Sequence, residues 1–419
     1  MNSPKKNLLL VTSGFPFGDT ERGFISTEFD VLAEKFNVHV IAVGSREELI
    51  HPLPENLPVE KYFHRLSSRS LSGVVRLIKN ALRPITLAEI FRSLCPKKPG
   101  LSLRRIKQII FYAAKADMAA EHMGRIVEDE KTDILYTYWC TEMTLAAAML
   151  KRKHPELVLV TRFHGHDLFT DRKPENYQPF RPFITKQATR LVFACREGER
   201  YYVSHWNGED KTRLCYLGCK DAPVLPLTEN GELRLVSCSN LIPLKRVDVI
   251  IGAVAKLPKE LRVRWDHFGD GTERQRLEVL AKEKLGSNVQ WHFHGRVPNN
   301  TLAARYAQIS PRLFITASST EGGAPVSIQE AFAMGIPAVG TAVGGIPDLI
   351  INGKTGYLLE PNATEEGLCN AIADFAKLAS EEKNEMSRNA RLLWAESFDA
   401  NKNASLFAQM LADLKGEKQ

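Results

Sequence analysis

Short apolar runs alternate with segments of helical spacing along most of the chain, and they fall into two series. Runs of this length are typical of strands that are buried on both faces of a parallel sheet. The first series of predicted strands is Leu8–Thr12, Val38–Val43, Ile134–Tyr138, Leu157–Phe163 and Leu191–Cys195. The second is Leu233–Ser239, Arg262–Phe268, Val289–Phe293, Leu313–Thr316 and Ala338–Gly340.

Helices are predicted between these strands. Phe24–Phe36 repeats apolar residues at helical spacing. Val326–Met334 is followed by Gly335, with Pro337 beyond it, which is a normal helix stop. The polar segment from Glu381 onward is also predicted to be largely helical.

A linker separates the two series. The stretch Asp221–Gly231, DAPVLPLTENG, combines proline and glycine with polar residues. Two strand–helix series joined in this way predict two doubly wound α/β domains that face each other across a cleft. We place the first domain at residues 1–222, with a C-terminal helix at about 400–419 packing back on it, and the second at residues 223–399.

The composition is that of an ordinary globular chain, since 44% of its 419 residues are hydrophobic and 25% are charged. Its 7 cysteines are scattered and include no CxxC pair, which fits reduced thiols in the cytoplasm. The N-terminus is too weakly apolar for a signal peptide, and no stretch approaches the ~20 apolar residues of a membrane span.

The positive charge is concentrated in one region. Between Lys61 and Ile110, 12 Lys and Arg residues accompany a single acid, Glu89, so the local net charge is +11 (12 − 1) against +7 for the whole chain. Apolar residues such as Leu71 and Ile78 interleave at amphipathic helical spacing, which predicts contact with an anionic membrane surface. A solvated helix face and attraction of anionic substrates are the alternatives. Nucleic-acid binding is not expected, because no motif for it is present.

Candidate residues of the first domain follow its strands, where chemistry gathers in such sheets. Gly14, in the loop SGFPFGDTERG, allows a ligand to approach the backbone, although a plain tight turn explains it equally well. His164, in FHGHDL, can exchange a hydrogen bond with a sugar hydroxyl or steady a developing charge, or it is a structural turn residue. A metal site at His164, His166 and Asp167 is disfavoured, because neighbours in a turn rarely converge on one ion.

The second domain carries two cations in LIPLKRVD. Lys245 and Arg246 are predicted at the start of a helix, where a bound diphosphate would offset their charge; a solvated surface is the alternative. The GDG at residues 269–271 is half of a dinucleotide fingerprint. An NAD-dependent oxidoreductase is disfavoured, because the third glycine and an acid ~20 residues later are missing.

Two carboxylates bracket the stretch EGGAPVSIQEA, at Glu321 and Glu330. Its glycine-rich loop and the pair Gly344 and Gly345 each follow a predicted strand, so their backbone N–H groups can hold a phosphate without a metal. Glu330 can accept two hydrogen bonds from a vicinal diol such as a ribose, and Glu321 can reach the next group along. The pattern therefore predicts a nucleotide sugar held between the two acids.

The run from Glu321 to Glu360 resembles the donor-binding signature of the retaining family 4 glycosyltransferases. The likeness extends over most of the chain and includes the Gly14 loop, FHGHDL, LIPLKRVD, GDG and HGRVPNNTL. The signature is highly specific, and the N-terminal half is less so. The resemblance implies the GT-B fold, with two Rossmann-like domains. It also implies a nucleoside-diphosphate sugar as donor, a glycan or lipid-linked acceptor, and no metal or other cofactor.

The resemblance also implies roles for individual residues. Lys245 matches the lysine that binds the donor diphosphate, and Glu330 matches the acid that holds the ribose. His164 matches the histidine near the donor sugar, and together with Glu321 it is the expected catalytic pair. The remaining donor-binding positions are Gly14 beside the reaction centre, Arg296 and Val297 at the nucleobase, and the loop Gly322, Gly323, Ala324, Pro325 and Val326.

Two positions depart from the family pattern. Asn240 stands where the family usually has an arginine, so one phosphate contact is missing or is supplied by a residue such as Arg246. Glu321 and Glu330 are also one residue further apart than usual. Either the loop bulges at residues 322–324, or Glu321 does not take the role of the first acid.

The predicted function is therefore retaining transfer of a hexosyl group from a nucleoside-diphosphate sugar, in bacterial surface polysaccharide synthesis. The expected location is the cytoplasm, with the protein peripheral on the inner face of the cell membrane. One alternative is a GT-B-like nucleotide-sugar epimerase or hydrolase. Another is a catalytically inactive sugar-nucleotide-binding subunit.

Overall fold

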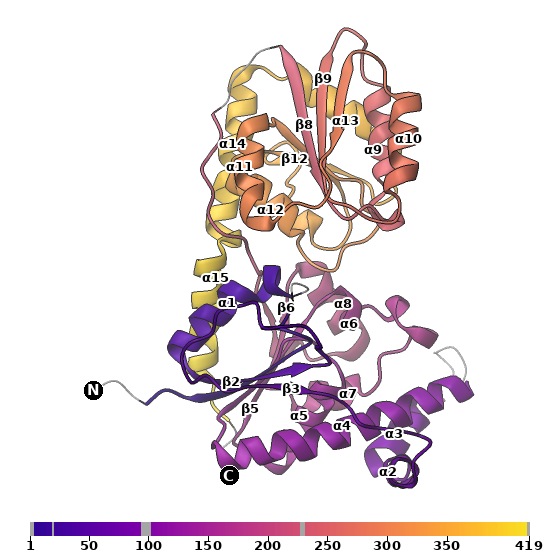
Figure 1. Ribbon diagram of the computed structural model, residues 1–419, viewed down its shortest axis with the longest axis vertical. Helices are drawn as coiled ribbons and strands as arrows, with labels where there is room; N and C mark the ends of the chain where they lie inside the picture. Colours follow the sequence, from indigo (N-terminus) through magenta and orange to yellow (C-terminus); the bar gives the residue numbers. More distant parts are fainter. Residues whose placement is uncertain (1–3, 19–20, 94–101, 227–230, 417–419) are drawn as a thin grey trace. The chain divides into compact units, whose positions relative to one another are not determined.

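The computed structural model describes residues 4–18, 21–93, 102–226 and 231–416. The chain divides into two compact units (Figure 1), and each is described by itself. Unit 1 comprises Met1–Cys215 and Ala404–Gln419, and unit 2 comprises Tyr216–Asn403. Within the predicted linker, residues 221–226 have no regular structure, and residues 227–230 lie outside the described residues.

Unit 1 is built on a parallel sheet of 7 strands in the order β3-β2-β1-β4-β5-β6-β7. The order runs outward in both directions from β1 and β4, which is the doubly wound arrangement. The strands are β1 Asn7–Thr12, β2 Asn37–Val43, β3 Val59–Tyr62, β4 Ile134–Thr137, β5 Val158–Phe163, β6 Arg190–Phe193 and β7 Thr212–Leu214.

Helices cover this sheet and fill the crossovers between its parallel strands. They are α1 Arg22–Lys35, α2 Leu71–Ala81, α3 Pro84–Ser93, α4 Leu103–Asp129, α5 Glu142–Lys153, α6 Gly165–Leu168, α7 Arg181–Gln187 and α8 Arg196–Trp206, with single 3₁₀ turns at Thr170–Arg172, Pro174–Asn176 and Glu209–Lys211. The chain returns to this unit through α15 Ala400–Asp413, where Phe407 packs on Tyr136 with ring centroids 5.1 Å apart.

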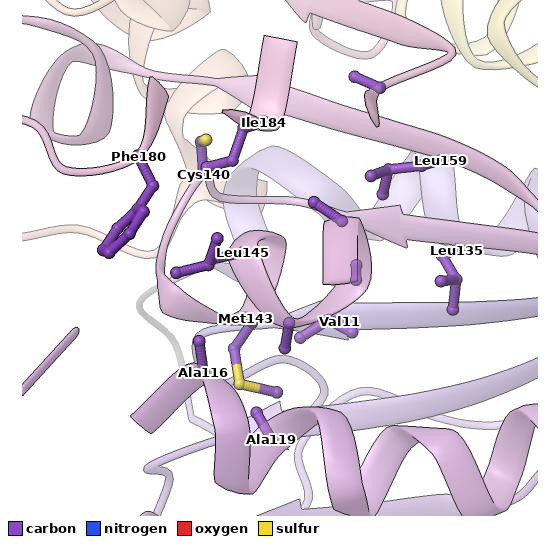
Figure 2. Close-up of a cluster of buried hydrophobic side chains, with 14 of the residues drawn as sticks. Val11, Ala116, Ala119, Leu135, Cys140, Met143, Leu145, Leu159, Phe180 and Ile184 are labelled. Atoms are coloured by element: carbon purple, nitrogen blue, oxygen red, sulfur yellow. The ribbon is translucent and has the colours of Figure 1, made fainter. Parts of the chain in front are cut away.

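The core of unit 1 lies between the sheet and helices α4, α5 and α7. Figure 2 shows this cluster, with Leu135 and Leu159 on neighbouring strands, Leu145 and Met143 on α5, and Ala119 on α4. Each of these side chains is almost fully buried. The mainly apolar residues of these strands make this two-sided burial favourable.

Unit 2 repeats the architecture with a parallel sheet of 6 strands in the order β10-β9-β8-β11-β12-β13. The strands are β8 Glu232–Cys238, β9 Arg262–Phe268, β10 Val289–Phe293, β11 Leu313–Ile315, β12 Ala338–Thr341 and β13 Gly356–Leu359. The helices are α9 Val247–Ala255, α10 Arg274–Lys284, α11 Asn299–Ile309, α12 Val326–Ala333, α13 Glu365–Lys377 and α14 Ser380–Leu393, with 3₁₀ turns at Pro243–Lys245 and Ile346–Asp348 and a π turn at Trp394–Phe398.

The fold class predicted from the sequence is confirmed: there are two doubly wound α/β units, and every predicted strand is present within two residues of its predicted ends. The helices predicted at 24–36 and 326–334 are α1 and α12. Strands β3, β7 and β13 were not predicted, because VEKY, TRL and GYLL are too short and too mixed in polarity to show a strand pattern. In the described part of the chain, no helix is long and apolar enough to cross a bilayer.

Candidate functional site

The strand order of unit 2 reverses between β8 and β11, and the loops that follow these two strands carry the predicted donor-binding residues. In an open parallel sheet, ligands bind at such a switch point, outside the carboxyl ends of the strands. Lys245 lies in the loop after β8, and Glu321 lies in the loop after β11. The topology therefore brings together residues that are 76 positions apart in the chain.

Lys245 and Glu321 form an ion pair, with 2.5 Å between the lysine Nζ and the glutamate Oε1. Both side chains are partly buried, at 22% and 13% exposed. Lys245 is the last residue of a 3₁₀ turn that precedes α9, so the helix itself begins after it. The site thus places one cation and one carboxylate in direct contact, which the sequence did not predict.

Three strand-exit loops are tied together around this pair. The N–H of Ser319 donates to the Leu244 carbonyl at 2.9 Å, and the Gly345 N–H donates to the Gly323 carbonyl at 3.1 Å. Among the described residues, the N–H groups of Gly322, Gly323 and Val326 have no hydrogen-bond acceptor. Free donors beside Lys245, at the start of α12, form a group that can receive an anion.

Gly345 is needed for this packing. A Cβ atom there would lie 2.2 Å from the Ala324 nitrogen and 2.5 Å from the Gly323 carbonyl carbon, and both are backbone atoms that cannot turn away. Glu321 packs just as closely against Gly344. A Cβ atom added at Gly344 would lie 2.7 Å from the Cβ atom of Glu321. Residues 322–325 form an irregular loop, and Glu321, which precedes it, pairs with Lys245.

We expect Gly345→Ala to weaken binding of a nucleotide sugar about tenfold or more, because the loop 322–324 must move to admit the new methyl group. Isothermal titration with the purified protein measures the effect. The matched control is Gly367→Ala in α13, where a Cβ meets its nearest neighbour at an ordinary 3.7 Å. Equal affinities for the two variants would show that the loop position is unimportant.

Glu330 lies one turn into α12, in a largely buried environment beside Cys238 and Tyr306. Burial raises the pKa of its carboxyl group from 4.5 to about 7, and a hydrogen bond from the Asn299 side chain opposes the shift. Near neutral pH the group is therefore close to half-ionised without a ligand. Asn299, the first residue of α11, was not predicted as a site residue.

Arg246 does not join Lys245 and Glu321. Its guanidinium Nη2 donates to the Ala363 carbonyl at 2.9 Å, and its backbone is left-handed, with φ of 48°. The suggestion that it replaces the family arginine missing at Asn240 stays a prediction. Asn240 itself is exposed in the loop after β8.

The GDG motif serves loop packing. A Cβ at Gly269 would lie 1.9 Å from the Ser239 carbonyl oxygen, and one at Gly271 would lie 2.3 Å from the Leu241 carbonyl oxygen. Both glycines thus let the loop after β9 close on the loop that carries Lys245. The segment after β10 is fixed beside them, because the Gly269 N–H donates to the Gly295 carbonyl at 2.9 Å.

The segment that is predicted to contact the nucleobase begins directly after Gly295. Arg296 is exposed, and Val297 is partly buried against the apolar cluster of unit 2. Asn299 comes two residues later, so the segment leads from Gly295 to the residue that contacts Glu330. Arg296 and Val297 therefore remain predictions whose backbone position is compatible with their proposed role.

In unit 1, the loop after β1 already contains an anion. The carboxylate of Glu21, which is 3% exposed, accepts hydrogen bonds from the N–H of Ser13 at 3.2 Å and of Phe15 at 2.8 Å, and from the Trp139 indole. Glu21 was missed from the sequence, since it looks like an ordinary helix-start acid. A Cβ at Gly14 would make only ordinary contacts, at 3.6 Å or more. Packing within the chain therefore does not require a glycine at this position.

His164 follows β5 and lies against aromatic rings, with its centroid 4.1 Å from Trp139 and 4.9 Å from Tyr138. Neither ring nitrogen has a hydrogen-bond partner in the described part of the chain. Burial, with a smaller contribution from Arg162, lowers the pKa of His164 to about 3. The neutral form of the ring is therefore favoured at physiological pH, and this form can donate one hydrogen bond and accept one.

The turn after β5 is organised by Asp167. Its carboxylate accepts from the His164 N–H at 2.7 Å and from the Cys140 N–H at 2.6 Å. His166 is exposed, whereas both ring nitrogens of His164 are buried, so the two histidines do not converge. Across the described residues, no three His, Cys, Asp or Glu side chains are placed to hold a metal ion.

Known proteins resemble this chain in sequence and in fold. Residues 226–393, which lie within unit 2, match the family model for glycosyl transferases group 1. A putative colanic acid biosynthesis glycosyltransferase, WcaL of Salmonella typhimurium, is 28% identical over 256 residues, covering 58% of this chain and 61% of that protein. An exopolysaccharide phosphotransferase of Streptomyces coelicolor is 34% identical over 385 residues, covering 90% of this chain but only 38% of that longer protein.

Two solved structures share the fold across almost the whole chain. The lipopolysaccharide outer core galactosyltransferase WaaB superposes with a TM-score of 0.70 at 13% identity, covering 97% of this chain and 100% of that one. HepE of Anabaena, solved in complex with UDP, superposes with a TM-score of 0.63 at 17% identity, covering 98% of this chain and 100% of that one. The chain thus has the GT-B fold, and its second unit matches the glycosyl transferases group 1 family.

Proposed function

We propose that this protein is a retaining glycosyltransferase that moves a hexosyl group from a nucleoside-diphosphate sugar to a glycan or lipid-linked acceptor. The observation that carries the proposal is the Lys245–Glu321 pair, held at the switch point of unit 2 beside free backbone N–H groups. The colanic acid and lipopolysaccharide names among the similar proteins support a role in bacterial surface polysaccharide synthesis. UDP in HepE supports a uridine nucleotide as the first donor to test.

Unit 2 binds the donor in this proposal. The diphosphate oxygens replace the Glu321 carboxylate as the partner of Lys245. They also accept hydrogen bonds from the N–H groups of the loop 322–326. Glu330 accepts hydrogen bonds from the ribose diol, and Glu321, released from the lysine, turns to the sugar hydroxyls. Arg296 and Val297 lie along the base.

The reaction breaks the bond between the anomeric carbon and the diphosphate oxygen, and forms a bond from the acceptor oxygen on the same face of the sugar. The acceptor proton passes to the departing phosphate oxygen, so no base from the enzyme is consumed. Negative charge grows on the diphosphate as it leaves, and Lys245 with the loop N–H groups stabilises it electrostatically. We propose that this stabilisation makes a metal unnecessary, and activity that persists in excess EDTA would support that view.

Roles are also proposed for His164 and Gly14 of unit 1. A neutral imidazole with two unpartnered nitrogens is suited to a hydrogen bond with a sugar hydroxyl, and this supports the role that the resemblance implies for His164. The absence of steric need for a glycine at position 14 supports close approach of a ligand to that backbone. The proposed location is the cytoplasmic face of the cell membrane, where such acceptors are assembled.

A thermal-shift panel of UDP, GDP and ADP and their sugars tests donor binding, since a ligand that binds only the folded state raises the melting temperature. We expect one nucleotide series to give a clear shift. The selected nucleotide sugar is then incubated with and without acceptor glycans, and the products are identified by mass spectrometry. An epimerised sugar, or hydrolysis that acceptors never redirect, would overturn the assignment as a transferase.

A further inference from the structure

Helix α2 is amphipathic, but its apolar side faces solvent. Leu71, Val74, Val75, Ile78 and Leu82 follow helical spacing along one side, and their exposed fractions are 82%, 38%, 56%, 56% and 67%. The opposite side, which faces the protein, carries Gly73 and Asn80, both buried. Large exposed apolar faces are uncommon on soluble proteins, and they usually mark an interaction surface.

Polar contacts hold α2 in this orientation. Asp117 of α4 is 4% exposed, and its carboxylate accepts from the Arg76 guanidinium at 2.9 Å and from the Asn80 amide at 3.2 Å. Arg83, just beyond the helix, donates to the same carboxylate. Turning the apolar side inward would leave Asp117 buried without these partners, which is strongly unfavourable.

Helix α3 has the same inverted character. Thr86, Glu89 and Ser93 are its buried residues, whereas Leu87 and Phe91 are 49% and 76% exposed. The Glu89 carboxylate is held inside by the Phe180 N–H at 2.9 Å and by the Tyr177 hydroxyl. Both helices thus bury polar side chains and expose apolar ones, although Ile85 and Ile90 of α3 are partly buried against the core of unit 1.

We call this surface the inverted face; it comprises Leu71, Val74, Val75, Ile78, Leu82, Leu87 and Phe91. The helices that carry it, α2 and α3, lie at one edge of unit 1 beside α4 (Figure 1). Among the described residues, half of all large apolar side chains that are exposed lie between Phe63 and Leu103.

The charge around the inverted face is positive. Lys79 on α2 and Arg104 and Lys107 on α4 are exposed. Glu89 is the sole acid between Lys61 and Ile110, and it is buried and paired with Arg92. No acid of this stretch is exposed, although Glu121 of α4 is 55% exposed and pairs with Arg76 of α2. The electrostatic attraction to an anionic surface is therefore expected mainly from Lys79, Arg104 and Lys107.

We propose that the inverted face docks on an anionic lipid bilayer, with its apolar side chains at the boundary of headgroups and acyl chains and Lys79, Arg104 and Lys107 against lipid phosphates. Exposed apolar side chains together with positive charge fit an anionic lipid surface. A protein partner would need only the exposed apolar side chains. Docking places the protein beside a lipid-linked acceptor, but it does not rest on the proposed transferase activity. Residues 94–101 of the basic region lie outside the described residues and are not part of this face.

Co-sedimentation with vesicles of phosphatidylglycerol and phosphatidylethanolamine tests the proposal, using the full chain without donor. We expect Ile78→Gln combined with Phe91→Gln to reduce partitioning at least tenfold. Both side chains are exposed, so the variant should keep its core. The matched control is Val279→Gln combined with Leu406→Gln, which changes two apolar side chains that are 52% and 61% exposed on α10 and α15.

Two further measurements keep the outcome decisive. Lys79→Ala with Lys107→Ala should weaken binding severalfold, and raising the salt concentration should weaken the wild type in the same way, because exposed charges are screened. Equal partitioning of the inverted-face variant and its control would overturn the proposal. The proposal would also be overturned if vesicles bind no protein and sedimentation velocity shows a dimer that the Ile78 and Phe91 substitutions abolish. The thermal shift with nucleotide sugar should be unchanged in these variants, so failure here leaves the donor site standing.

Discussion

Lys245→Ala is expected to lower transferase activity by a factor of about 10²–10³, which is the typical effect of removing one preorganised group from a site where negative charge develops. The lysine is the cation that contacts Glu321 at 2.5 Å, and its loss would leave that carboxylate facing the diphosphate. The variant should therefore bind nucleotide sugar poorly as well as react slowly. Steady-state kinetics with the nucleotide sugar selected by thermal shift measure both effects.

A second substitution separates the repulsion between Glu321 and the diphosphate from the lost attraction between Lys245 and the diphosphate. Adding Glu321→Gln to Lys245→Ala should recover part of the donor binding, because the carboxylate no longer opposes the phosphates. The control is Lys256→Ala at the other end of α9, an exposed lysine that pairs with Glu365 and Glu366 and should be dispensable. If Lys245→Ala and Lys256→Ala have the same activity, Lys245 does not bind the diphosphate.

The fold was predictable because its sheets are buried on both faces. Strands such as Leu8–Thr12 and Leu313–Thr316 are apolar at every position except a final threonine, and the glycine and proline turns between them are clear in the sequence. The topological switch follows from the order of the elements, so Lys245 and Glu321 could be assigned to one point before any contact was known. Their direct ion pair is the part of the site that the structure adds.

Other parts of the site depend on packing that no local pattern records. Glu21 looks like a first-turn acid, and its role as the anion of the β1 loop appears only when Trp139, 118 residues away, is brought beside it. Arg246 adjoins Lys245 in sequence, but a left-handed backbone turns it toward Ala363. The inverted face is a further example: amphipathic spacing was evident at Leu71 and Ile78, whereas the burial of Asn80 on the opposite side was not.

Donor affinity should rise with pH through the titration of Glu330. Its pKa is raised from 4.5 to about 7 by burial, and the ionised form is the stronger acceptor for the ribose hydroxyls. If only that form binds well, the affinity falls with the ionised fraction, so binding at pH 5 should be of the order of 10²-fold weaker than at pH 8. A nucleotide sugar is the proper ligand, because its diphosphate is esterified at both ends and does not titrate in this range.

Glu330→Gln should flatten this pH profile, whereas Glu366→Gln, which changes an exposed carboxylate, should leave it intact. The free energy of unfolding gives a second measurement, and the contribution of Glu330 to it should change with pH in the opposite direction to donor affinity. Because the carboxyl group binds its proton more tightly in the folded state, its contribution to the free energy of unfolding falls as pH rises from about 4.5 to about 7, by up to about 3 kcal/mol. Glu330→Gln should therefore be more stable than wild type at pH 8 in urea. A wild-type affinity that is constant from pH 5 to pH 8, with this stability difference present, would mean that Glu330 is buried as described but does not hold the donor.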